Sequence, residues 1–509
     1  MTSSISGNSS NALLVRRNTL WNMFGLGFPL VLAVLFIPRL ISGMGTDRFG
    51  VLTIILTFLN YFGFFDLGIG RALTQLLAGR AHEDKKEEAA LIWTVSVLLG
   101  GLGTFAALIL FLAAPFVVSK LLRIQGSLAA ETILALRELG FILPFLLHSL
   151  ALRGILEARR RFDLSNLIRI PVGVFSFGAP ILVLPFSHNL GIIVAIILSG
   201  RILAWALNLW MIFHILPHLK HMWGWKPGDI WSLMRYGGWY TVSSVVAPIT
   251  DSLDRLFIST FLSISMVAYY TTPYELINKL GILSGSVGGA IFPEFAFRLR
   301  KSKREAEILF LRGFKYLLTI LFPFVLIATA YSREGLALWL NPQFAILSAP
   351  VLQWLAIFVF IIGGAVVPLV FLQGAGRPDL SARMHLLELP IHAALLYAFI
   401  KLDGIRGAAI ACVFRISIDF LGMLFFSGSL LGFKAGTYGR ILLPMGTAIA
   451  VLFGFHIPMP ALLKFSLVLF VLVLYLYLAW SFILEQRDKA AILRVSQHFP
   501  RFFSRGSNE

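Results

Sequence analysis

The stretch "ITDSLDRLFIST" (residues 249–260) carries three charges in a segment that is otherwise apolar enough for the interior of a membrane. Counted from Asp251, Asp254 lies three and Arg255 four residues further on, so one helix would hold all three side chains on the same face. A charge at the centre of a bilayer costs about 3 kcal/mol even on the mildest scales. The stretch therefore predicts a membrane helix whose charged face meets a polar cavity or other charges rather than lipid.

Similar apolar segments recur along the whole chain. Of the 509 residues, 58% are hydrophobic and 13% are charged, whereas a soluble domain carries about 25% charged residues. A membrane helix needs about 20 mostly apolar residues, and the gaps between such runs are too short for a soluble domain. Arg16 and Arg17 precede a long apolar segment, which we interpret as a first membrane helix rather than a cleaved signal. The composition predicts an all-α polytopic membrane protein.

We predict about fourteen membrane helices, near residues 19–41, 48–70, 90–118, 133–156, 166–185, 190–214, 236–260, 267–292, 309–331, 348–373, 381–400, 405–430, 440–457 and 463–484. A weak internal repeat supports a division into halves, because Arg17 and Trp21 have the spacing of Arg235 and Trp239 and "LFI" follows each pair. Transporters are often built from such repeats. The predicted organisation is a cytoplasmic tail (1–18), an N-terminal six-helix bundle (19–214), a cytoplasmic linker (215–235), a C-terminal six-helix bundle (236–430), two extra helices (431–484) and a cytoplasmic tail (485–509), with the two pseudo-symmetric bundles around a central cavity.

The charge distribution orients the chain. An even number of helices puts both termini on one side, and most of the 43 Lys and Arg residues fall in the segments assigned to that side. Basic loops mark the cytoplasmic face, so both termini are predicted to be cytoplasmic. The net charge of +18 then reflects topology, and we expect no nucleic-acid partner.

Several ionisable residues fall well inside the predicted helices, and they are the candidate site residues. They are Arg201, Asp251, Asp254, Arg255, Glu275, Lys279, Glu388, Arg415 and Asp419, with His392 as a neutral companion. Three pairs are four residues apart, namely Asp251 with Arg255, Glu275 with Lys279, and Arg415 with Asp419. If each pair simply forms an ion pair within its own helix, these charges have a structural role and no role in transport. Arg201, Asp254 and Glu388 have no obvious partner on their own helix, which favours a shared polar chamber.

Arg71, in "FFDLGIGRAL" (64–73), lies at the cytoplasmic end of the second predicted helix and either meets an anionic headgroup or simply marks the helix end. No metal-ligand spacing, phosphate loop or nucleophile elbow is present, so the sequence predicts no enzyme, no cofactor and no metal site. His214, His218 and His221 could share a face, but a metal site in that loop is the weaker interpretation. Cys412 is predicted to be a small core residue.

Four segments carry a family resemblance. They are "GMGTDRFGVLTIILTFLNYFGFFDLGIGRALTQLLA" (43–78), "DRLFISTFLSISMVAYYTTPYELINKL" (254–280), "IFPEFAFR" (291–298) and "FLQGAGRPDL" (371–380). In this order and spacing they resemble the polysaccharide transporters of the multidrug/oligosaccharidyl-lipid/polysaccharide exporter superfamily, over about residues 14–485. The resemblance implies two bundles that alternate access to a central cavity. It also implies a flippase of the bacterial inner membrane, which moves a polyprenyl-pyrophosphate-linked oligosaccharide to the outer leaflet in an ion- or proton-coupled cycle.

Under this hypothesis the basic residues form a cradle for the pyrophosphate, because Arg binds it through a planar set of donors. The cradle is predicted to contain Arg201, Arg255, Lys279, Arg415 and Arg71, and the coupling acids to be Asp251, Asp254, Glu388, Asp419 and Glu275. Expected partners are the lipid bilayer, the lipid-linked glycan, and a polysaccharide polymerase with chain-length or export proteins.

Three alternatives remain open. A multidrug or toxin cation antiporter of the same fold would need fewer basic cavity residues. A membrane-embedded polysaccharide polymerase or glycosyltransferase would need a long outer loop, and the longest outer gaps here are short. A scaffold of cell-wall assembly would have no use for charges inside the membrane.

Overall fold

The structure is a computed structural model, and it describes residues 32, 34–59, 73, 77, 85–159, 161–226, 228, 250 and 252–483. Every regular element in these residues is a helix, and nine helices are long and apolar enough to cross a membrane. The prediction of an all-α polytopic membrane protein is therefore confirmed. The count of fourteen spans stays a prediction, because residues 60–72 and 229–249 lie outside the described part.

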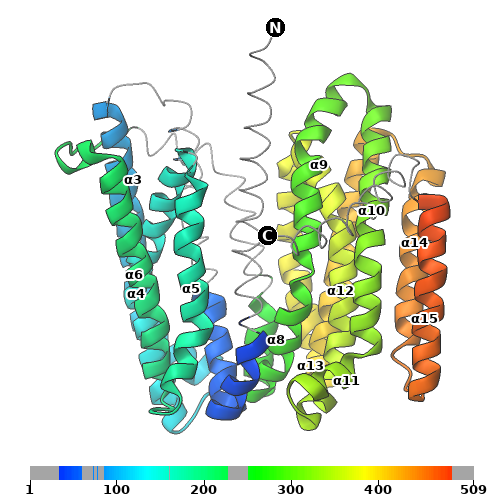
Figure 1. The fold of residues 1–509 in the computed structure, drawn as a ribbon, viewed down its shortest axis with the longest axis horizontal. Helices are drawn as coiled ribbons and strands as arrows, with labels where there is room; N and C mark the ends of the chain where they lie inside the picture. The colour runs from blue at the N-terminus through cyan, green and yellow to red at the C-terminus, as the bar shows by residue number, and fades with distance from the viewer. Residues whose placement is uncertain are drawn as a thin grey trace, which may run out of the picture. The chain divides into compact units, whose positions relative to one another are not determined.

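The chain divides into two compact units. The first contains the residues up to Leu276 together with Ser381–Ala411, and the second contains Ile277–Leu380 together with the residues from Cys412 onward. Each unit is a bundle of long helices (Figure 1). The predicted linker at 215–235 is described only as far as residue 226, apart from residue 228, so the predicted domain boundary remains a prediction.

The first unit is built around α4. Its helices are Val34–Leu59, α3 (Lys85–Phe116) with a π turn at Val117–Leu121, α4 (Ser127–Ala158), α5 (Phe162–Val183), α6 (Leu190–Ile215), a 3-10 turn at Pro217–Lys220, residues 252–261, α8 (Ile264–Asn278) and the first part of α13 (Pro378–Leu431). Helix α4 packs against both α3 and α6, and α5 packs against α6 (Figure 1). The predicted spans for α3, α4, α5 and α6 agree with these bounds to within several residues.

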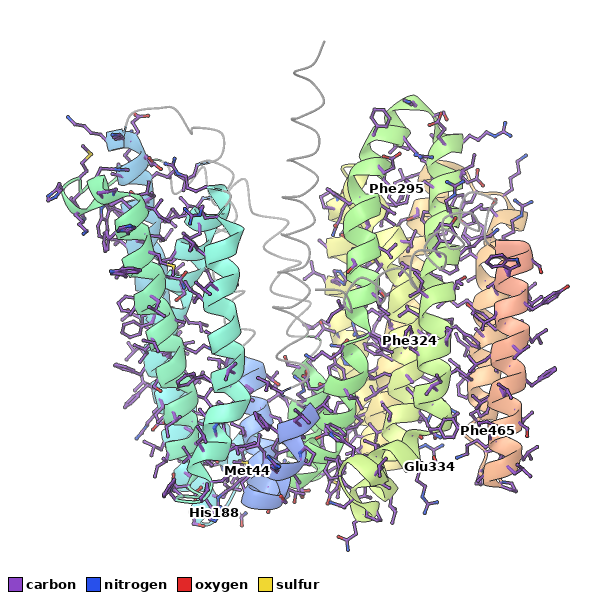
Figure 2. The ribbon with its side chains drawn as sticks, in the orientation of Figure 1. Met44, His188, Phe295, Phe324, Glu334 and Phe465 are labelled. Atoms are coloured by element: carbon purple, nitrogen blue, oxygen red, sulfur yellow. The ribbon has the colours of Figure 1, made fainter. Side chains whose placement is uncertain are left out.

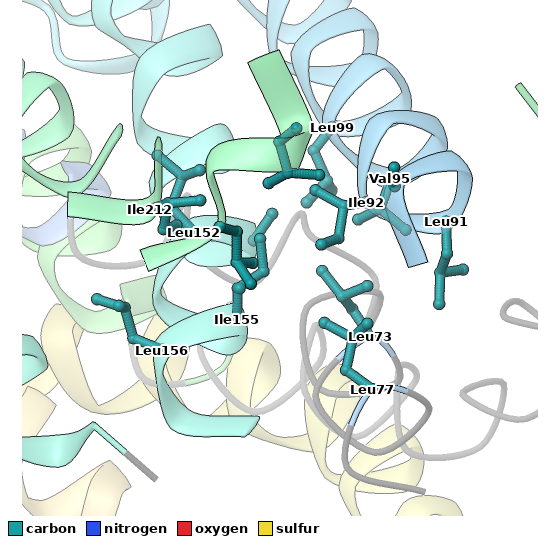
Figure 3. Close-up of a cluster of buried hydrophobic side chains, with 14 of the residues drawn as sticks. Leu73, Leu77, Leu91, Ile92, Val95, Leu99, Leu152, Ile155, Leu156 and Ile212 are labelled. Atoms are coloured by element: carbon teal, nitrogen blue, oxygen red, sulfur yellow. The ribbon is translucent and has the colours of Figure 1, made fainter. Parts of the chain in front are cut away.

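Small residues set the distance between α3 and α4. A Cβ atom on Gly103 would lie 2.5 Å from the Cα atom of Pro144, so only glycine fits there. Close backbone approach at small residues is a usual means of packing helices in membranes. Beyond this contact, aliphatic side chains of α3, α4 and α6 bury a common core with Leu73 and Leu77 (Figure 3). The core explains why a largely apolar α3 has a defined orientation toward α4.

The second unit consists of α9 (Gly281–Lys301), α10 (Lys303–Ala330), α11 (Ser332–Trp339), α12 (Pro342–Gly374), the rest of α13, α14 (Ala435–Gly454), α15 (Ala461–Leu478) and a π turn at Ala479–Ile483. Helices α9, α10 and α12 pack together around buried phenylalanines, among them Phe295 and Phe310, whose rings are 6.3 Å apart. Phe324 on α10 and Phe465 on α15 instead keep about half of their surface accessible, as lipid-facing residues do (Figure 2).

Polar capping residues and glycines mark where the apolar helices begin or break. The side chains of Asn189, Ser302 and Asn341 accept hydrogen bonds from backbone N–H groups in the first turns of α6, α10 and α12. These caps satisfy donors that lipid could not satisfy. Gly404 has φ +57°, a conformation that L residues rarely adopt, and it breaks α13 where the sequence predicts the gap between two spans.

The predicted span 267–292 is wrong as one helix. Helix α8 ends at Asn278 and α9 begins at Gly281. Between them, the N–H groups of Leu280, Ile282 and Leu283 donate to carbonyls three residues earlier, so the backbone tightens into a turn. Lys279 lies in this break and is exposed, rather than inside a helix as predicted.

Candidate functional site

Arg255 occupies the centre of a buried polar contact in the first unit. The residue is 2% exposed. Its Nη1 atom donates to Thr57 Oγ1 at 2.5 Å, and its Nη2 atom donates to Glu275 Oε1 at 3.0 Å. Its guanidinium carbon lies 5.0 Å from the centre of the Tyr274 ring. The charge in the 249–260 stretch therefore ties together three helical segments, namely Val34–Leu59, residues 252–261 and α8.

A glycine makes this contact possible. A Cβ atom on Gly50 would lie 2.2 Å from the carbonyl oxygen of Ile264, so Val34–Leu59 approaches the start of α8 directly at this point. Thr57 follows Gly50 by seven residues, which is two helical turns, and so it lies on the same face. The close approach brings the Thr57 hydroxyl within reach of the Arg255 guanidinium.

The acids around Arg255 have different surroundings. Asp254 is 1% exposed, and its Oδ1 atom accepts a hydrogen bond from the Arg255 backbone N–H at 2.7 Å. The Glu275 side chain is 42% exposed. Its ion pair with Arg255 joins residues twenty positions apart, so the sequence did not predict it. Asp251, the predicted helical partner of Arg255, lies outside the described residues, as does Arg71.

The first part of α13 presents a second polar face in this unit. Glu388 and His392 are each 1% exposed. His385 Nδ1 lies 4.0 Å from Glu388 Oε1, and this contact becomes an ion pair when the imidazole is protonated. Spacings of three and four place these residues on one helix face. His385, one turn earlier, is therefore a conditional partner of Glu388 on its own helix.

In the second unit, Arg415 and Asp419 are buried one turn apart on the last part of α13. The Arg415 guanidinium carbon lies 5.7 Å from the centre of the Phe358 ring on α12. The Oδ1 atom of Asp419 is buried and accepts no hydrogen bond from a described residue. Phe420, the next residue, stacks on Phe314 of α10 at 5.9 Å and so fixes the orientation of this helix.

Arg201, on α6, differs from all of these residues. The residue is half-buried, and its Nε atom is buried without a hydrogen-bond partner among the described residues. The positive charge of Arg153 on α4 lies close enough to repel it. Two contacts fix α4 and α6 as parallel neighbours, since Glu131 Oε2 accepts from the Leu190 N–H and Trp205 Nε1 donates to His148 Nδ1, each at 3.0 Å.

Sequence reasoning missed the charges of α4. Arg48 makes a two-pronged ion pair with Glu131, with donor–acceptor distances of 2.7 and 3.0 Å. Glu138 and Arg153 lie on the same helix, within 133–156, and were not counted among the interior charges. The signal was available in the sequence, because both fall inside the predicted span.

The helices and their packing define the fold of the multidrug and lipid flippases. The chain superposes on the lipid II flippase MurJ in an inward closed conformation with a TM-score of 0.69, at 14% identity, over 90% of this chain and 97% of that one. It superposes on an inward-facing multidrug resistance MATE family transporter of the MOP superfamily with a TM-score of 0.64, at 17% identity, over 82% of this chain and 96% of that one.

A family model described as polysaccharide biosynthesis protein matches residues 37–348, and the chain belongs to this family. It is also 28% identical, over 410 residues, to the "Putative O-antigen transporter" of Shigella flexneri, a match that covers 80% of this chain and 96% of that protein. The predicted family and fold are therefore confirmed.

Proposed function

We propose that this protein flips a polyprenyl-pyrophosphate-linked oligosaccharide from the inner to the outer leaflet by alternating access, driven by a proton or ion gradient. Its family, its similarity to an O-antigen transporter and its fold in common with a lipid II flippase support this proposal. The bacterial inner membrane, with both termini in the cytoplasm, is the location that goes with it. The polymerase and the chain-length or export proteins remain proposed partners.

The observation that carries the proposal is the state of Arg201. A guanidinium in the membrane with no protein acceptor among the described residues, repelled by a second arginine, is costly unless an anion arrives. A pyrophosphate supplies two or more negative charges and several acceptor oxygens, which match the planar donor set of arginine. Arg201 is therefore the first contact we assign to the pyrophosphate.

We assign less weight to the other proposed ligands of the pyrophosphate, which are Arg255, Lys279, Arg415 and Arg71. Arg255 already donates to Thr57 and Glu275, so it could bind substrate only after those bonds are released. Asp251, Asp254, Glu275, Glu388 and Asp419 remain the proposed coupling acids. Asp419 has the best support of these, because its buried Oδ1 atom has no donor among the described residues.

The test is a flipping assay in proteoliposomes that contain a polyprenyl-pyrophosphate-linked glycan. An impermeant glycosidase reports the fraction of glycan in the outer leaflet. Arg201→Gln should lower the flipping rate by about 10- to 100-fold, the factor that corresponds to the loss of a charged hydrogen bond. Arg304→Gln, at an exposed position on α10, is the matched control and should flip normally. Normal flipping by Arg201→Gln would remove Arg201 from the cradle, and no flipping by the unaltered protein would reject the flippase.

A multidrug antiporter is the second candidate, and the similarity to the MATE transporter favours it. The two functions can be distinguished experimentally because their substrates have opposite charges. An antiporter of cationic drugs should gain activity when Arg201 is neutralised, because the like charge is removed, whereas a flippase of anionic lipids should lose activity.

A further inference from the structure

Glu138 is an acid inside the membrane for which the described residues provide no cation. It lies eleven residues after Ser127, the start of α4, which is about 16 Å along a helix that rises 1.5 Å per residue. The hydrocarbon core of a bilayer is about 30 Å thick. Its Oε2 atom is buried and accepts no hydrogen bond from a described residue, and no described Lys, Arg or His forms an ion pair with it.

The preceding residue, Arg137, contacts an aromatic ring. Arg137 places its guanidinium carbon 4.6 Å from the centre of the Phe111 ring on α3. This cation–π contact stabilises the charge of Arg137 without a carboxylate. Consecutive helical residues point about 100° apart, so Glu138 leaves the helix in a different direction from Arg137.

The elements packed against α4 provide few other charges. Residues 89–119 of α3 and the π turn contain no ionisable residue; Lys120 lies in the π turn (Val117–Leu121), which also packs against α4. On α6 the titratable or charged groups are Arg201 and His214, and on α5 they are Asp163 and Arg169, whose side chains lie outside the described set. On α4 itself, Glu131 is bound to Arg48, and His148 accepts from Trp205. Arg153 lies nearer the far end of the helix, where its charge reaches Arg201.

A carboxylate in these surroundings is unstable as an ion, because burial in a low dielectric without a partner disfavours the charged form. The residue as a whole is only partly buried. We infer that Glu138 binds and releases a proton within the membrane, and that it is a further proton-coupling carboxyl group of the first unit, beside the acids proposed above. The coupling role rests on the proposed transport function, whereas the proton-binding site does not.

The proton site is tested by infrared spectroscopy of the full chain in lipid nanodiscs, recorded across a pH series. The carbonyl stretch of a protonated carboxylic acid reports the site directly. The spectrum of the unaltered protein minus that of Glu138→Gln should contain one such band that titrates with pH. The matched control is Glu131→Gln on the same helix, whose carboxylate is paired with Arg48 and which should leave this band in place. If Glu138→Gln retains every titrating carboxyl band, the inference is wrong.

The coupling role is tested with the flipping assay described above. With an imposed pH gradient, the unaltered protein should flip faster than without one. Glu138→Gln should keep the rate measured without a gradient and lose the acceleration. An unchanged acceleration in Glu138→Gln would overturn the coupling role. Absence of flipping by the unaltered protein would reject the proposed function, while the infrared band would still decide whether Glu138 binds a proton.

Discussion

Arg255, which is buried, and Arg201, which is half-buried, are two arginines of the same unit with opposite surroundings. Arg255 donates to a hydroxyl and a carboxylate and lies over an aromatic ring. Arg201 has no acceptor among the described residues and is repelled by Arg153. Only Arg255 recovers the cost of desolvation through contacts within the described part of the protein. The difference indicates that Arg255 holds helices together, whereas the proposed function assigns Arg201 to the anionic substrate.

The largest expected effect is the loss of stability on Arg255→Leu. This substitution leaves the Thr57 hydroxyl and the Glu275 carboxylate without their donor. We expect the free energy of unfolding to fall by about 3 kcal/mol, the lower end for a broken buried pair, because Glu275 is partly exposed. Thermal unfolding in detergent, followed by tryptophan fluorescence, measures it. An unchanged unfolding temperature would mean that Arg255 does not hold the helices together.

A smaller decrease in the free energy of unfolding is expected for Thr57→Val, which keeps the shape of the side chain and removes the hydroxyl. Loss of a hydrogen bond to a charged group costs about 1.5–3 kcal/mol. Thr53→Val is the matched control, because the Thr53 hydroxyl donates only to the Gly50 carbonyl one turn earlier on the same helix. The comparison fails if both variants unfold at the same temperature.

Arg201→Leu should change stability in the opposite direction. Replacing a charge without an acceptor by an apolar side chain removes a desolvation cost, and we expect a gain of about 1 kcal/mol. The same unfolding measurement applies. Flipping activity should be lost in this more stable variant. A loss of stability as large as that of Arg255→Leu would show that Arg201 has a structural partner.

The smallest effect concerns an ion pair at the surface of the second unit. Lys464 Nζ lies 2.6 Å from Glu334 Oε1 on α11, and the Glu334 side chain is 53% exposed. Burial acts to raise the pKa of Glu334, but the hydrogen bond from Lys464 and the charges of Lys464 and Arg333 outweigh it and hold the pKa below its ordinary value. Such a pair contributes at most about 1 kcal/mol.

Because the folded pKa of Glu334 is lowered, its contribution to stability is complete above the ordinary pKa of 4.5 and is lost as the pH falls below that value. Glu334→Gln should remove this part of the pH dependence. The reaction of Cys412, the one cysteine of the chain, with a thiol dye reports unfolding of this unit, since Cys412 is buried. Equal pH profiles for both proteins would show that the pair contributes nothing.

The class of protein and most of the helices could be predicted from the residues alone. Long apolar runs can satisfy backbone polar groups in lipid only as helices, so composition alone predicts an all-α membrane protein. Caps and glycines such as Asn189 and Gly404 mark helix ends because their effects are local. Family motifs then supplied the fold. The break at Lys279 escaped prediction because Glu275 and Lys279 have a spacing that suits one continuous helix.

Which charges have partners follows from the packing of the helices. Spacing along the chain proposes partners three or four residues apart, but Arg255 bonds to Thr57, nearly two hundred residues earlier, and to Glu275 on another helix. Arg201 and Glu138 resemble any other membrane charges in the sequence. Whether a buried charge has a partner depends on helix register and on close contacts such as that of Gly50 with Ile264. These are properties of packing, because the energy of a charge depends on the atoms around it and not on its neighbours in the chain.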